Sequence, residues 1–239
     1  MTMMATLNTR PPFLSLTIGA KQYLQRIMAL GTIEEVAEAY DTNPSFWMGL
    51  LPLREAVASL PEPADSSMRI PIYLDRDGVL CINTHYPYLP SELVLGHQVP
   101  PFFRKLWKLT QQNPRAQPYP VVVSNQSGVS RGYFTPEDCL RFEQALSQAI
   151  ESASGYTIPL DRYYHCWEQN ECFLRKPNPG MLLLASLEHK LNPGQGYMVG
   201  DKPSDIAAGR RAGVRKAFLL EEGTTLLDVL GSIEQDLVE

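Results

Sequence analysis

Two carboxylates follow a short apolar run in the first half of the chain. The run Ile72-Tyr73-Leu74 predicts a buried strand, and Asp75 and Asp77 come directly after it. Gly78 lets the backbone turn there, so the two carboxylates can be directed at different parts of one site. Asp75 would then attack a phosphoryl group to form an acyl phosphate, while Asp77 would donate and later accept a proton. The alternative is an acidic turn without chemistry, because Asp-Gly pairs are common in turns.

Three later stretches carry groups that suit a phosphate and a metal ion. A β-branched run at 121–123 ends in Ser124 and Asn125, whose hydroxyl and amide can bind phosphate oxygens without adding charge. Arg175-Lys176 supplies fixed positive charge, and a further apolar strand at 197–200 ends at Asp201. Carboxylates this close together favour a bound cation, and their hard oxygen atoms favour Mg²⁺.

In this order and at this spacing, these stretches resemble the four motifs of the haloacid dehalogenase superfamily. The resemblance is closer to one branch, the D-glycero-D-manno-heptose bisphosphate phosphatases and the related histidinol phosphatases. The stretches that carry it are Asp75-Arg76-Asp77-Gly78, Ser124-Asn125-Gln126-Ser127-Gly128-Val129-Ser130-Arg131-Gly132-Tyr133-Phe134, Arg175-Lys176-Pro177-Asn178-Pro179-Gly180-Met181 and Gly200-Asp201-Lys202. The resemblance covers residues 70 to 222.

The resemblance implies a Mg²⁺-dependent phosphomonoesterase that works through an aspartyl-phosphate intermediate. It places Lys176 against the phosphate, and it assigns Arg131 and Arg175 to the substrate beyond the reacting phosphate. Asp205 is expected to cap the next helix or to support the metal site from outside. The complete expected set is Asp75, Asp77, Ser124 and Lys176 for catalysis, Asn125, Arg131 and Arg175 for substrate binding, and Asp75, Asp77 and Asp201 for Mg²⁺.

The resemblance also implies a class of substrate, a small phosphorylated sugar such as a heptose bisphosphate. Histidinol phosphate is the alternative within the same branch. An alternative of a different kind is a non-catalytic binding or scaffold protein on the same fold, although the intact acids and Lys176 argue against it. A nucleic-acid end phosphatase would need a basic groove, which a net charge of -5 does not favour.

Members of this branch often carry a zinc loop, with three Cys and one His, before the Arg-Lys-Pro motif. In this chain the interval 163–175 is much shorter, and Leu174 stands where the last cysteine would be. His165, Cys166 and Cys172 are the remaining candidate ligands, whereas structural zinc prefers four. We therefore expect Mg²⁺ as the cofactor and no zinc.

From Arg69 onward, apolar runs alternate with helical periodicity, which predicts an α/β fold with a Rossmann-like, doubly wound and mainly parallel sheet. The expected strands end at Leu74, Ser124, Cys166, Gly200 and Leu220, and the expected helices begin at 101, 136, 180, 203 and 226. No large cap insertion follows either of the first two motifs. The loop at 81–101 is expected to lie beside Asp75.

Residues 1–60 precede the first motif and are predicted to form a helical extension, joined by a linker at 61–69 to a phosphatase domain at 70–239. Apolar residues recur at helical spacing in 20–30 and 32–40, with a capping box at Thr32 and Glu35. We expect these helices to pack on the main domain or on a second subunit, which would give a homo-oligomer. A lid over the site is the alternative.

The composition is typical of a globular protein: of the 239 residues, 44% are hydrophobic and 20% are charged. The four cysteines lack the spacing of a disulfide framework, and no apolar run approaches the length of a membrane span. The first residues lack the basic start and apolar core of a signal peptide. We therefore expect a cytoplasmic protein that binds neither nucleic acid nor a membrane.

Overall fold

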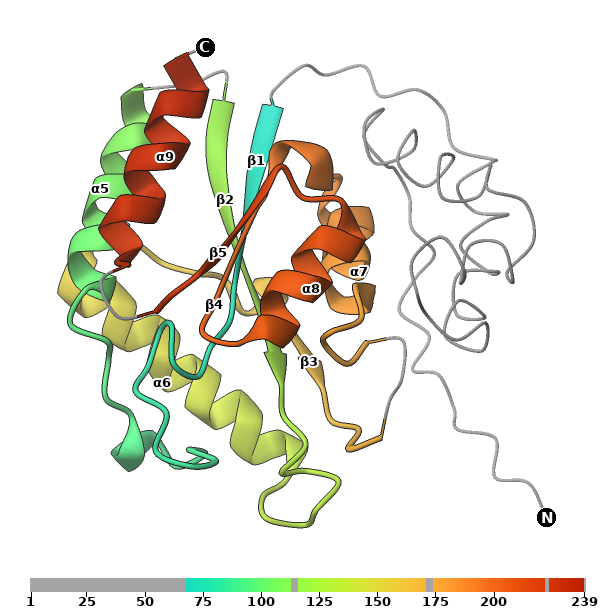
Figure 1. Cartoon of the computed structure of the whole chain (residues 1–239). Helices are drawn as coiled ribbons and strands as arrows, with labels where there is room; N and C mark the ends of the chain where they lie inside the picture. Colours follow the sequence, from blue (N-terminus) through green and yellow to red (C-terminus); the bar gives the residue numbers. More distant parts are fainter. Residues whose placement is uncertain (1–67, 113–115, 171–173, 222–223, 239) are drawn as a thin grey trace, which may run out of the picture.

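The computed structural model describes residues 68–112, 116–170, 174–221 and 224–238 (Figure 1). The expected helical extension at 1–60 and most of the expected linker at 61–69 lie outside these residues. The first strand begins at Met68, so the α/β domain begins slightly before the expected boundary at residue 70.

The described residues form a sheet of five parallel strands, with β1 (Met68–Leu74) in its centre. The other strands are β2 (Ala116–Asn125), β3 (Tyr163–Cys166), β4 (Tyr197–Gly200) and β5 (Lys216–Leu219), and the order across the sheet is β3-β2-β1-β4-β5. After β1 the chain forms β2 and β3 on one side of β1, and then β4 and β5 on its other side. The predicted parallel sheet is therefore confirmed.

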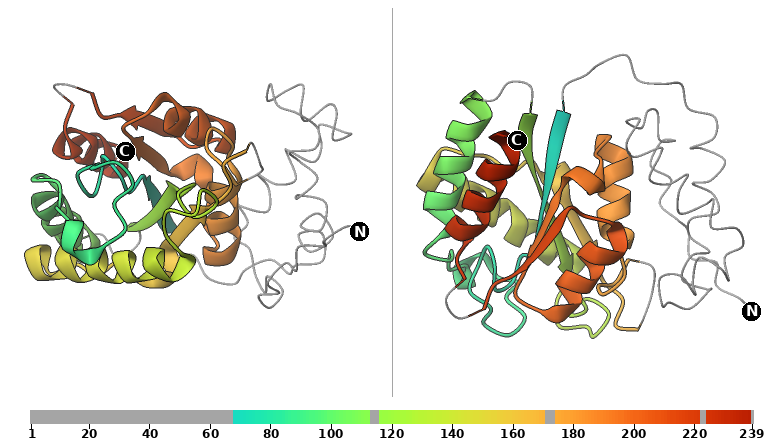
Figure 2. Two further views of the ribbon diagram at one scale, coloured as in Figure 1. Left: turned by 90° about the horizontal axis from the view of Figure 1, so that it is seen from below. Right: turned by 45° about the horizontal axis from the view of Figure 1, so that its top comes forward.

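Helices cover both faces of the sheet (Figures 1 and 2). One face carries α5 (Val99–Gln112), α6 (Pro136–Ser154) and α9 (Leu226–Val238), and the other carries α7 (Gly180–His189) and α8 (Pro203–Ala212). Short 3-10 turns stand at Pro90–Glu92, Leu160–Arg162 and Pro193–Gln195. This arrangement confirms the doubly wound architecture expected from the sequence.

A hydrophobic core lies between the sheet and the helices α5, α6 and α9, which cover one of its faces. β1 is covered on both sides, and Ile72, Tyr73 and Leu74 are inaccessible to solvent. A strand covered on both sides needs a continuous apolar run, which is the pattern that its sequence shows. The helical side chains that pack in this core include Phe102, Phe103, Leu106, Val229, Leu230 and Ile233.

β2 begins at Ala116, earlier than the predicted start at Val121. Its earlier part contains Pro118 and Pro120, and proline lacks the N–H group that a central strand must donate. β3 pairs with β2 only from Val122 onward, so both prolines lie where β1 is the neighbouring strand on one side alone. A strand that is open on one side tolerates prolines in this way.

The predicted helix starts at 136 and 226 are confirmed, and a capping threonine precedes each of them. Thr135 Oγ1 accepts the Asp138 N–H at the start of α6, and Thr225 Oγ1 accepts the Asp228 N–H at the start of α9. Gly213, with a φ of 74°, ends α8 in the left-handed conformation that glycine adopts without strain. Local side-chain chemistry therefore sets where these helices begin and end.

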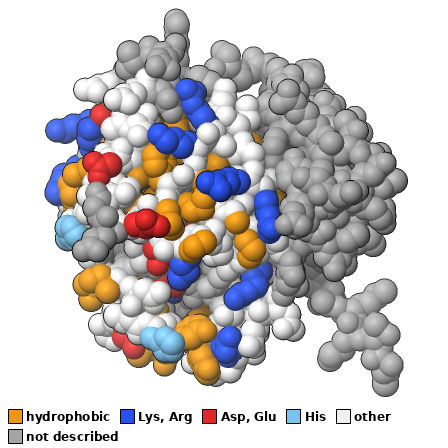
Figure 3. Space-filling view, in the orientation of Figure 1, with side chains coloured by type: hydrophobic (Ala, Val, Ile, Leu, Met, Phe, Trp, Pro, Cys, Tyr) orange, Lys and Arg blue, Asp and Glu red, His pale blue; other side chains and the backbone are white. Residues whose placement is uncertain are grey.

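Figure 3 shows one face of the molecule, on which Lys and Arg side chains are interspersed with acidic and apolar ones. The described part of that face therefore differs from the continuous basic strip typical of nucleic-acid-binding proteins. The described helices include none that is both long and apolar enough to cross a membrane.

Candidate active site

The carboxyl ends of β1, β2 and β4 bring the expected site residues to one edge of the sheet (Figure 2, left). Asp75 follows β1, Ser124 and Asn125 end β2, and Asp201 follows β4. Lys176 lies on the connection between β3 and α7. The strand order diverges at β1, and the loops outside such a point form the ligand crevice of open α/β sheets.

The Lys176 ammonium group is buried between two carboxylates. Its Nζ lies 2.7 Å from Asp75 Oδ1 and 2.7 Å from Asp205 Oδ1, and it donates a third bond to the Val123 carbonyl at 2.8 Å. All three ammonium donors are therefore used. Burial acts to lower the pKa of Lys176, but the two carboxylates raise it above its ordinary value, so Lys176 remains a cation.

Burial also raises the pKa of Asp75, to about 6. The nearby Lys176 charge opposes this rise, and the Asp205 charge adds to it. A divalent cation at the site would favour the ionised form of Asp75 in the same way as Lys176 does.

Three carboxylates converge beside the tip of β1. One oxygen from each of Asp75, Asp201 and Asp205 lies within 4.8 Å of the others. Asp201 Oδ1 is buried without a hydrogen-bond partner among the described residues, although Lys202 Nζ lies 3.4 Å away. The backbone comes close at Gly78, where a Cβ atom would fall 2.2 Å from Asp201 Oδ2. An oxygen cluster with an unsatisfied carboxylate atom suits a hard divalent cation such as Mg²⁺.

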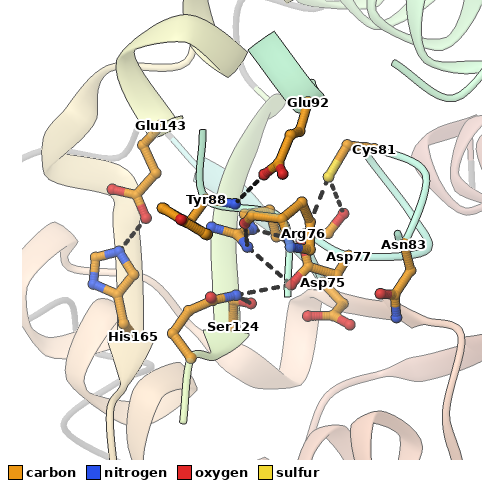
Figure 4. A network of polar contacts seen from close by, with 12 residues as sticks. Asp75, Arg76, Asp77, Cys81, Asn83, Tyr88, Glu92, Ser124, Glu143 and His165 are labelled. Atoms are coloured by element: carbon orange, nitrogen blue, oxygen red, sulfur yellow. Dashed lines mark hydrogen bonds and ion pairs between the residues drawn. The ribbon is translucent and has the colours of Figure 1, made fainter. Parts of the chain in front are cut away.

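The carboxylate of Asp77 is directed to other partners (Figure 4). Arg76 binds it through Nε to Oδ1 at 2.7 Å and Nη2 to Oδ2 at 3.0 Å, and Gln126 Nε2 donates to Oδ2 at 2.8 Å. Burial acts to raise the pKa of Asp77, but the charge and hydrogen bonds of Arg76 bring it below its ordinary value. The Asp77 carboxylate therefore lies outside the converging group of Asp75, Asp201 and Asp205, and its expected role at the metal site stays a prediction.

Ser124 and Asn125 both lie at the site, but their side chains have different partners. Ser124 is buried, and its Oγ accepts a hydrogen bond from Gln126 Nε2 at 2.8 Å. Asn125 Nδ2 donates to the Lys176 carbonyl at 2.9 Å, and Asn125 Oδ1 accepts the Lys176 N–H at 3.0 Å. The Asn125 amide therefore fixes the main chain that carries Lys176, and its expected contact with a substrate stays a prediction.

The two arginines expected on the substrate lie in loops at this edge of the sheet. Arg131 is exposed in the loop between β2 and α6. Arg175 is partly exposed, and its Nη1 donates to the Glu168 carbonyl at 2.8 Å. Neither guanidinium is buried, so both remain accessible to an anionic ligand.

The loop after β1 lies beside the site, as expected, because Arg76 Nη2 donates to the Pro87 carbonyl at 3.0 Å. This loop also contacts the one that carries Arg131. Tyr88 stacks on Phe134 with ring centroids 5.3 Å apart, and the Tyr86 and Tyr133 rings meet edge to face at 5.2 Å. The two loops together form an aromatic rim next to the strand tips.

The candidate zinc ligands have other surroundings in this structure. His165 Nε2 contacts Glu143 Oε1, and Cys166 is buried at the end of β3. Cys172 lies outside the described residues. No His or Cys side chain of the described residues belongs to the converging group of metal-ligand type, which consists of Asp75, Asp201 and Asp205.

Sequence analysis assigned no role to Arg76, Gln126 or Glu143. The buried contact of Glu143 could have been predicted from its position in the sequence. Glu143 lies one helical turn from Cys139 and from Leu146, and both of these residues are buried. A charge on the apolar face of a helix indicates a buried polar contact. The partners of Arg76 and Gln126 follow only from the geometry of the turn after β1.

Comparison with known proteins yields relatives in sequence and in structure. Residues 173–238 match the family model described as HAD-hydrolase-like. A D-glycero-beta-D-manno-heptose-1,7-bisphosphate 7-phosphatase of Helicobacter pylori is 32% identical over 151 residues, which cover 62% of this chain and 82% of that protein.

Two solved structures share the fold. A putative HAD-like phosphatase from Mesorhizobium loti has a TM-score of 0.58 and 26% identity, and the match covers 74% of this chain and 91% of that one. The D,D-heptose 1,7-bisphosphate phosphatase from B. bronchiseptica, solved with magnesium and phosphate, has a TM-score of 0.58 and 23% identity, with 70% of this chain and 99% of that one covered.

A doubly wound sheet with converging aspartates and a buried lysine at its strand tips, together with these relatives, defines a phosphoric monoester hydrolase. The resemblance to the haloacid dehalogenase superfamily is thereby confirmed. The chain belongs to the haloacid dehalogenase superfamily, in the family that includes the heptose-1,7-bisphosphate 7-phosphatases.

Proposed function

We propose that this phosphatase hydrolyses a small phosphorylated sugar, and that a heptose bisphosphate is the best-fitting substrate. The observation that carries the proposal is the buried cluster of Asp75, Lys176 and Asp205 at the strand tips, beside the unsatisfied oxygen of Asp201. The 32% identity to a heptose-1,7-bisphosphate 7-phosphatase supports the choice of sugar.

In this proposal Asp75 is the nucleophile and Asp77 transfers protons. A carboxylate oxygen of Asp75 bonds to phosphorus as the bond from phosphorus to the sugar oxygen breaks, and Asp77 protonates that departing oxygen. Water then attacks phosphorus, Asp77 accepts the water proton, and the bond to Asp75 breaks to release inorganic phosphate. Lys176 and Ser124 stabilise the charge that develops on the transferring phosphoryl group.

The proton that Asp77 donates is taken up together with the substrate. In the free protein the Arg76 charge opposes the effect of burial and lowers the pKa of Asp77, so this group is ionised at neutral pH. A bound phosphate brings negative charge next to Asp77, which favours its protonated form. Asp77 is then ready to protonate the leaving oxygen.

Mg²⁺ would be held by Asp75 and Asp201, with Asp205 as a supporting group. Asp205 Oδ2 already accepts the Lys202 N–H at 3.0 Å, and its Oδ1 binds Lys176, so Asp205 orients the cluster from behind. When bound, Mg²⁺ neutralises negative charge on the phosphoryl oxygens. The unsatisfied Asp201 Oδ1 supports this assignment.

Replacing Gly78 by Ala is expected to weaken Mg²⁺ binding. Gly78 has a φ of 94°, and the new Cβ would fall 2.2 Å from Asp201 Oδ2, so Asp201 must move. Displacement of a metal ligand or of its support typically costs about 10–100-fold in metal affinity. We expect the Mg²⁺ concentration for half-maximal activity, and that for half-maximal thermal stabilisation, to rise by this factor.

Gly231→Ala is the matched control, because a Cβ at Gly231 on α9 would meet no atom within 4 Å. This variant should keep the Mg²⁺ dependence of the parent protein. A Gly78→Ala variant with unchanged Mg²⁺ dependence would remove Asp201 from the proposed metal site.

The second phosphate of a bisphosphate would bind outside the strand tips. Arg131 and Arg175 are accessible in loops at this edge, and a guanidinium binds phosphate oxygens through paired N–H groups. Histidinol phosphate, the alternative substrate, carries cationic groups at the corresponding end, and two arginines would repel them. This contrast in charge favours the bisphosphate.

A hydrolysis screen with Mg²⁺ tests the proposed substrate. It compares both anomers of D-glycero-D-manno-heptose 1,7-bisphosphate with the two heptose monophosphates, hexose phosphates, histidinol phosphate and nucleotides. We expect the highest kcat/KM for a heptose bisphosphate, with release of only one phosphate. A higher kcat/KM for histidinol phosphate would overturn the assignment, and inactivity towards every ester would favour the scaffold alternative.

The remaining parts of the proposal concern the whole chain. We place the protein in the cytoplasm, and we assign residues 1–60 to a helical extension that packs on the phosphatase domain or on a second subunit. The amphipathic patterns at 20–30 and 32–40 support this assignment.

A further inference from the structure

Arg76 is a fully buried cation directly behind the proposed proton-transfer group. Its side chain is inaccessible to solvent although it lies between two aspartates at a strand tip. Removing a guanidinium from water is costly unless it is paired with charged or polar groups. The partners of Arg76 therefore indicate why the charge is there.

The strongest partner of Arg76 is the Asp77 carboxylate. The Nε–Oδ1 distance is 2.7 Å and the Nη2–Oδ2 distance is 3.0 Å, which is the two-pronged geometry that fixes a carboxylate in both position and plane (Figure 4). The two bonds occupy one lone pair on each oxygen. The second lone pair of Oδ2 accepts a hydrogen bond from Gln126 Nε2 at 2.8 Å, and that of Oδ1 accepts the Cys81 thiol at 3.5 Å.

Other contacts hold Arg76 itself in place. The guanidinium carbon lies 4.5 Å from the centre of the Phe142 ring, and Nη2 also donates to the Pro87 carbonyl at 3.0 Å. The Arg76 carbonyl accepts the N–H groups of Leu80 and Cys81 at 2.9 and 3.1 Å. Arg76 therefore joins the turn after β1, the following loop and helix α6.

A second buried acid balances this region electrostatically. Glu143 on α6 is 1% exposed, and its Oε1 contacts His165 Nε2. Burial acts to lower the pKa of Arg76, whereas the charges of Asp77 and, more weakly, of Glu143 raise it. Among the described residues, neither Arg76 Nη1 nor Glu143 Oε2 has a hydrogen-bond partner, although both atoms are buried.

We propose that Arg76 is a positioning residue for proton transfer: its guanidinium holds the Asp77 carboxylate away from the metal cluster and in line with the leaving oxygen, and Glu143 supplies the second countercharge. The proposal rests on the proposed role of Asp77 as general acid. It explains why Asp77 stays out of the group formed by Asp75, Asp201 and Asp205. A free carboxylate so close to a divalent cation would be drawn to coordinate it.

A lysine at this position would keep the charge and lose the two-pronged geometry. Arg76→Lys should therefore keep a positive charge beside Asp77 but leave its carboxyl group poorly oriented. The step that suffers is the one in which the bond from phosphorus to the leaving oxygen breaks and Asp77 protonates that oxygen. An ester whose leaving oxygen is a stable anion does not need this proton.

The test compares two aryl esters of similar size, phenyl phosphate and 4-nitrophenyl phosphate, on the Mg²⁺-loaded full-length protein. Phenolate is a basic leaving group, with a conjugate acid of pKa about 10 as in tyrosine, and nitrophenolate is far less basic. The quantity measured is kcat/KM, because it covers the steps up to phosphorylation of Asp75 and omits the later hydrolysis. Misplacing a catalytic group by about 1 Å costs about 10²-fold.

We expect Arg76→Lys to lower kcat/KM for phenyl phosphate by about 10²-fold and to leave that for 4-nitrophenyl phosphate nearly unchanged. Asp77→Asn, whose amide has no acidic proton, serves as the reference. It should show the same loss for phenyl phosphate and little loss for 4-nitrophenyl phosphate. If Arg76→Lys is recovered unfolded, the pair Arg76→Gln/Glu143→Gln, which removes the Arg76 and Glu143 charges together, carries the same comparison.

Three results would contradict the proposal. Equal losses for both esters in the Arg76 variant would show a structural role only, and unchanged activity with both would show no role. In either case, a loss in Asp77→Asn that is confined to phenyl phosphate would leave the proposed function intact. If Asp77→Asn itself shows no selectivity, the general-acid role of Asp77 is wrong, and the positioning role of Arg76 falls with it.

Discussion

Replacing Asp75 by Asn is expected to reduce hydrolysis of every phosphate ester to the level of a reaction without enzyme. The amide is nearly the same size as the carboxylate, but it is not a competent nucleophile. Asp75 is 4% exposed, and one of its oxygens lies 2.7 Å from Lys176 Nζ. The described carboxylates in the same cluster are those of Asp201 and Asp205, and Asp205 is held by Lys176 and by the Lys202 N–H.

The control for this variant is its stability. An amide oxygen can still accept the Lys176 bond, so the melting temperature should remain close to that of the parent protein. Activity near the parent level in Asp75→Asn, purified from a host that lacks contaminating phosphatases, would rule out covalent catalysis through this residue.

Replacing Lys176 by Met is expected to give the largest loss of stability. Lys176 is 3% exposed and neutralises both Asp75 and Asp205, and removing one partner of a buried ion pair typically costs about 3–5 kcal/mol. We expect a reduction of this size in the free energy of unfolding, measured by urea denaturation in the presence of a metal chelator. Excess Mg²⁺ should restore part of the loss, because it can replace the missing positive charge between the carboxylates.

Lys105→Met is the matched control for the lysine substitution. Lys105 pairs with Glu234 at 2.5 Å, but its side chain is 44% exposed, and such a surface pair contributes less than about 1 kcal/mol. If Lys176→Met is as stable as the parent protein when both are measured without metal, the carboxylates of Asp75 and Asp205 are protonated in the parent rather than paired with Lys176. Catalysis should fall in Lys176→Met even where Mg²⁺ restores folding.

The positions of the strand tips could be predicted because their cause is local in the sequence. A strand buried on both faces requires an uninterrupted apolar run, so the ends of Ile72-Tyr73-Leu74 and of the run before Ser124 were visible without a structure. Parallel strands bring such ends to one edge, which is why Asp75 and Ser124 were expected together. The helix starts at Thr135 and Thr225 were visible for a similar reason, since a cap is a contact within one turn.

The contacts between distant residues could not be predicted in the same way. Whether Asp77 or Asp205 joins the metal cluster depends on the direction of each side chain, which is set by Arg76 in one case and by Lys176 in the other. Asn125 was expected on the substrate because an amide at a strand tip is free to bind a phosphate. Its two bonds to the Lys176 backbone become visible only when the loops are placed.

The proposed function depends above all on phosphorylation of Asp75 during turnover. It is tested most directly by quenching the Mg²⁺-loaded enzyme with acid during hydrolysis and locating the phosphoryl group by peptide mass spectrometry. We expect an acid-stable, base-labile phosphoryl group on Asp75, which accumulates further in Asp77→Asn with 4-nitrophenyl phosphate because the water proton then has no acceptor. Turnover that continues without any modification of Asp75, or with the phosphoryl group on another residue, would contradict it.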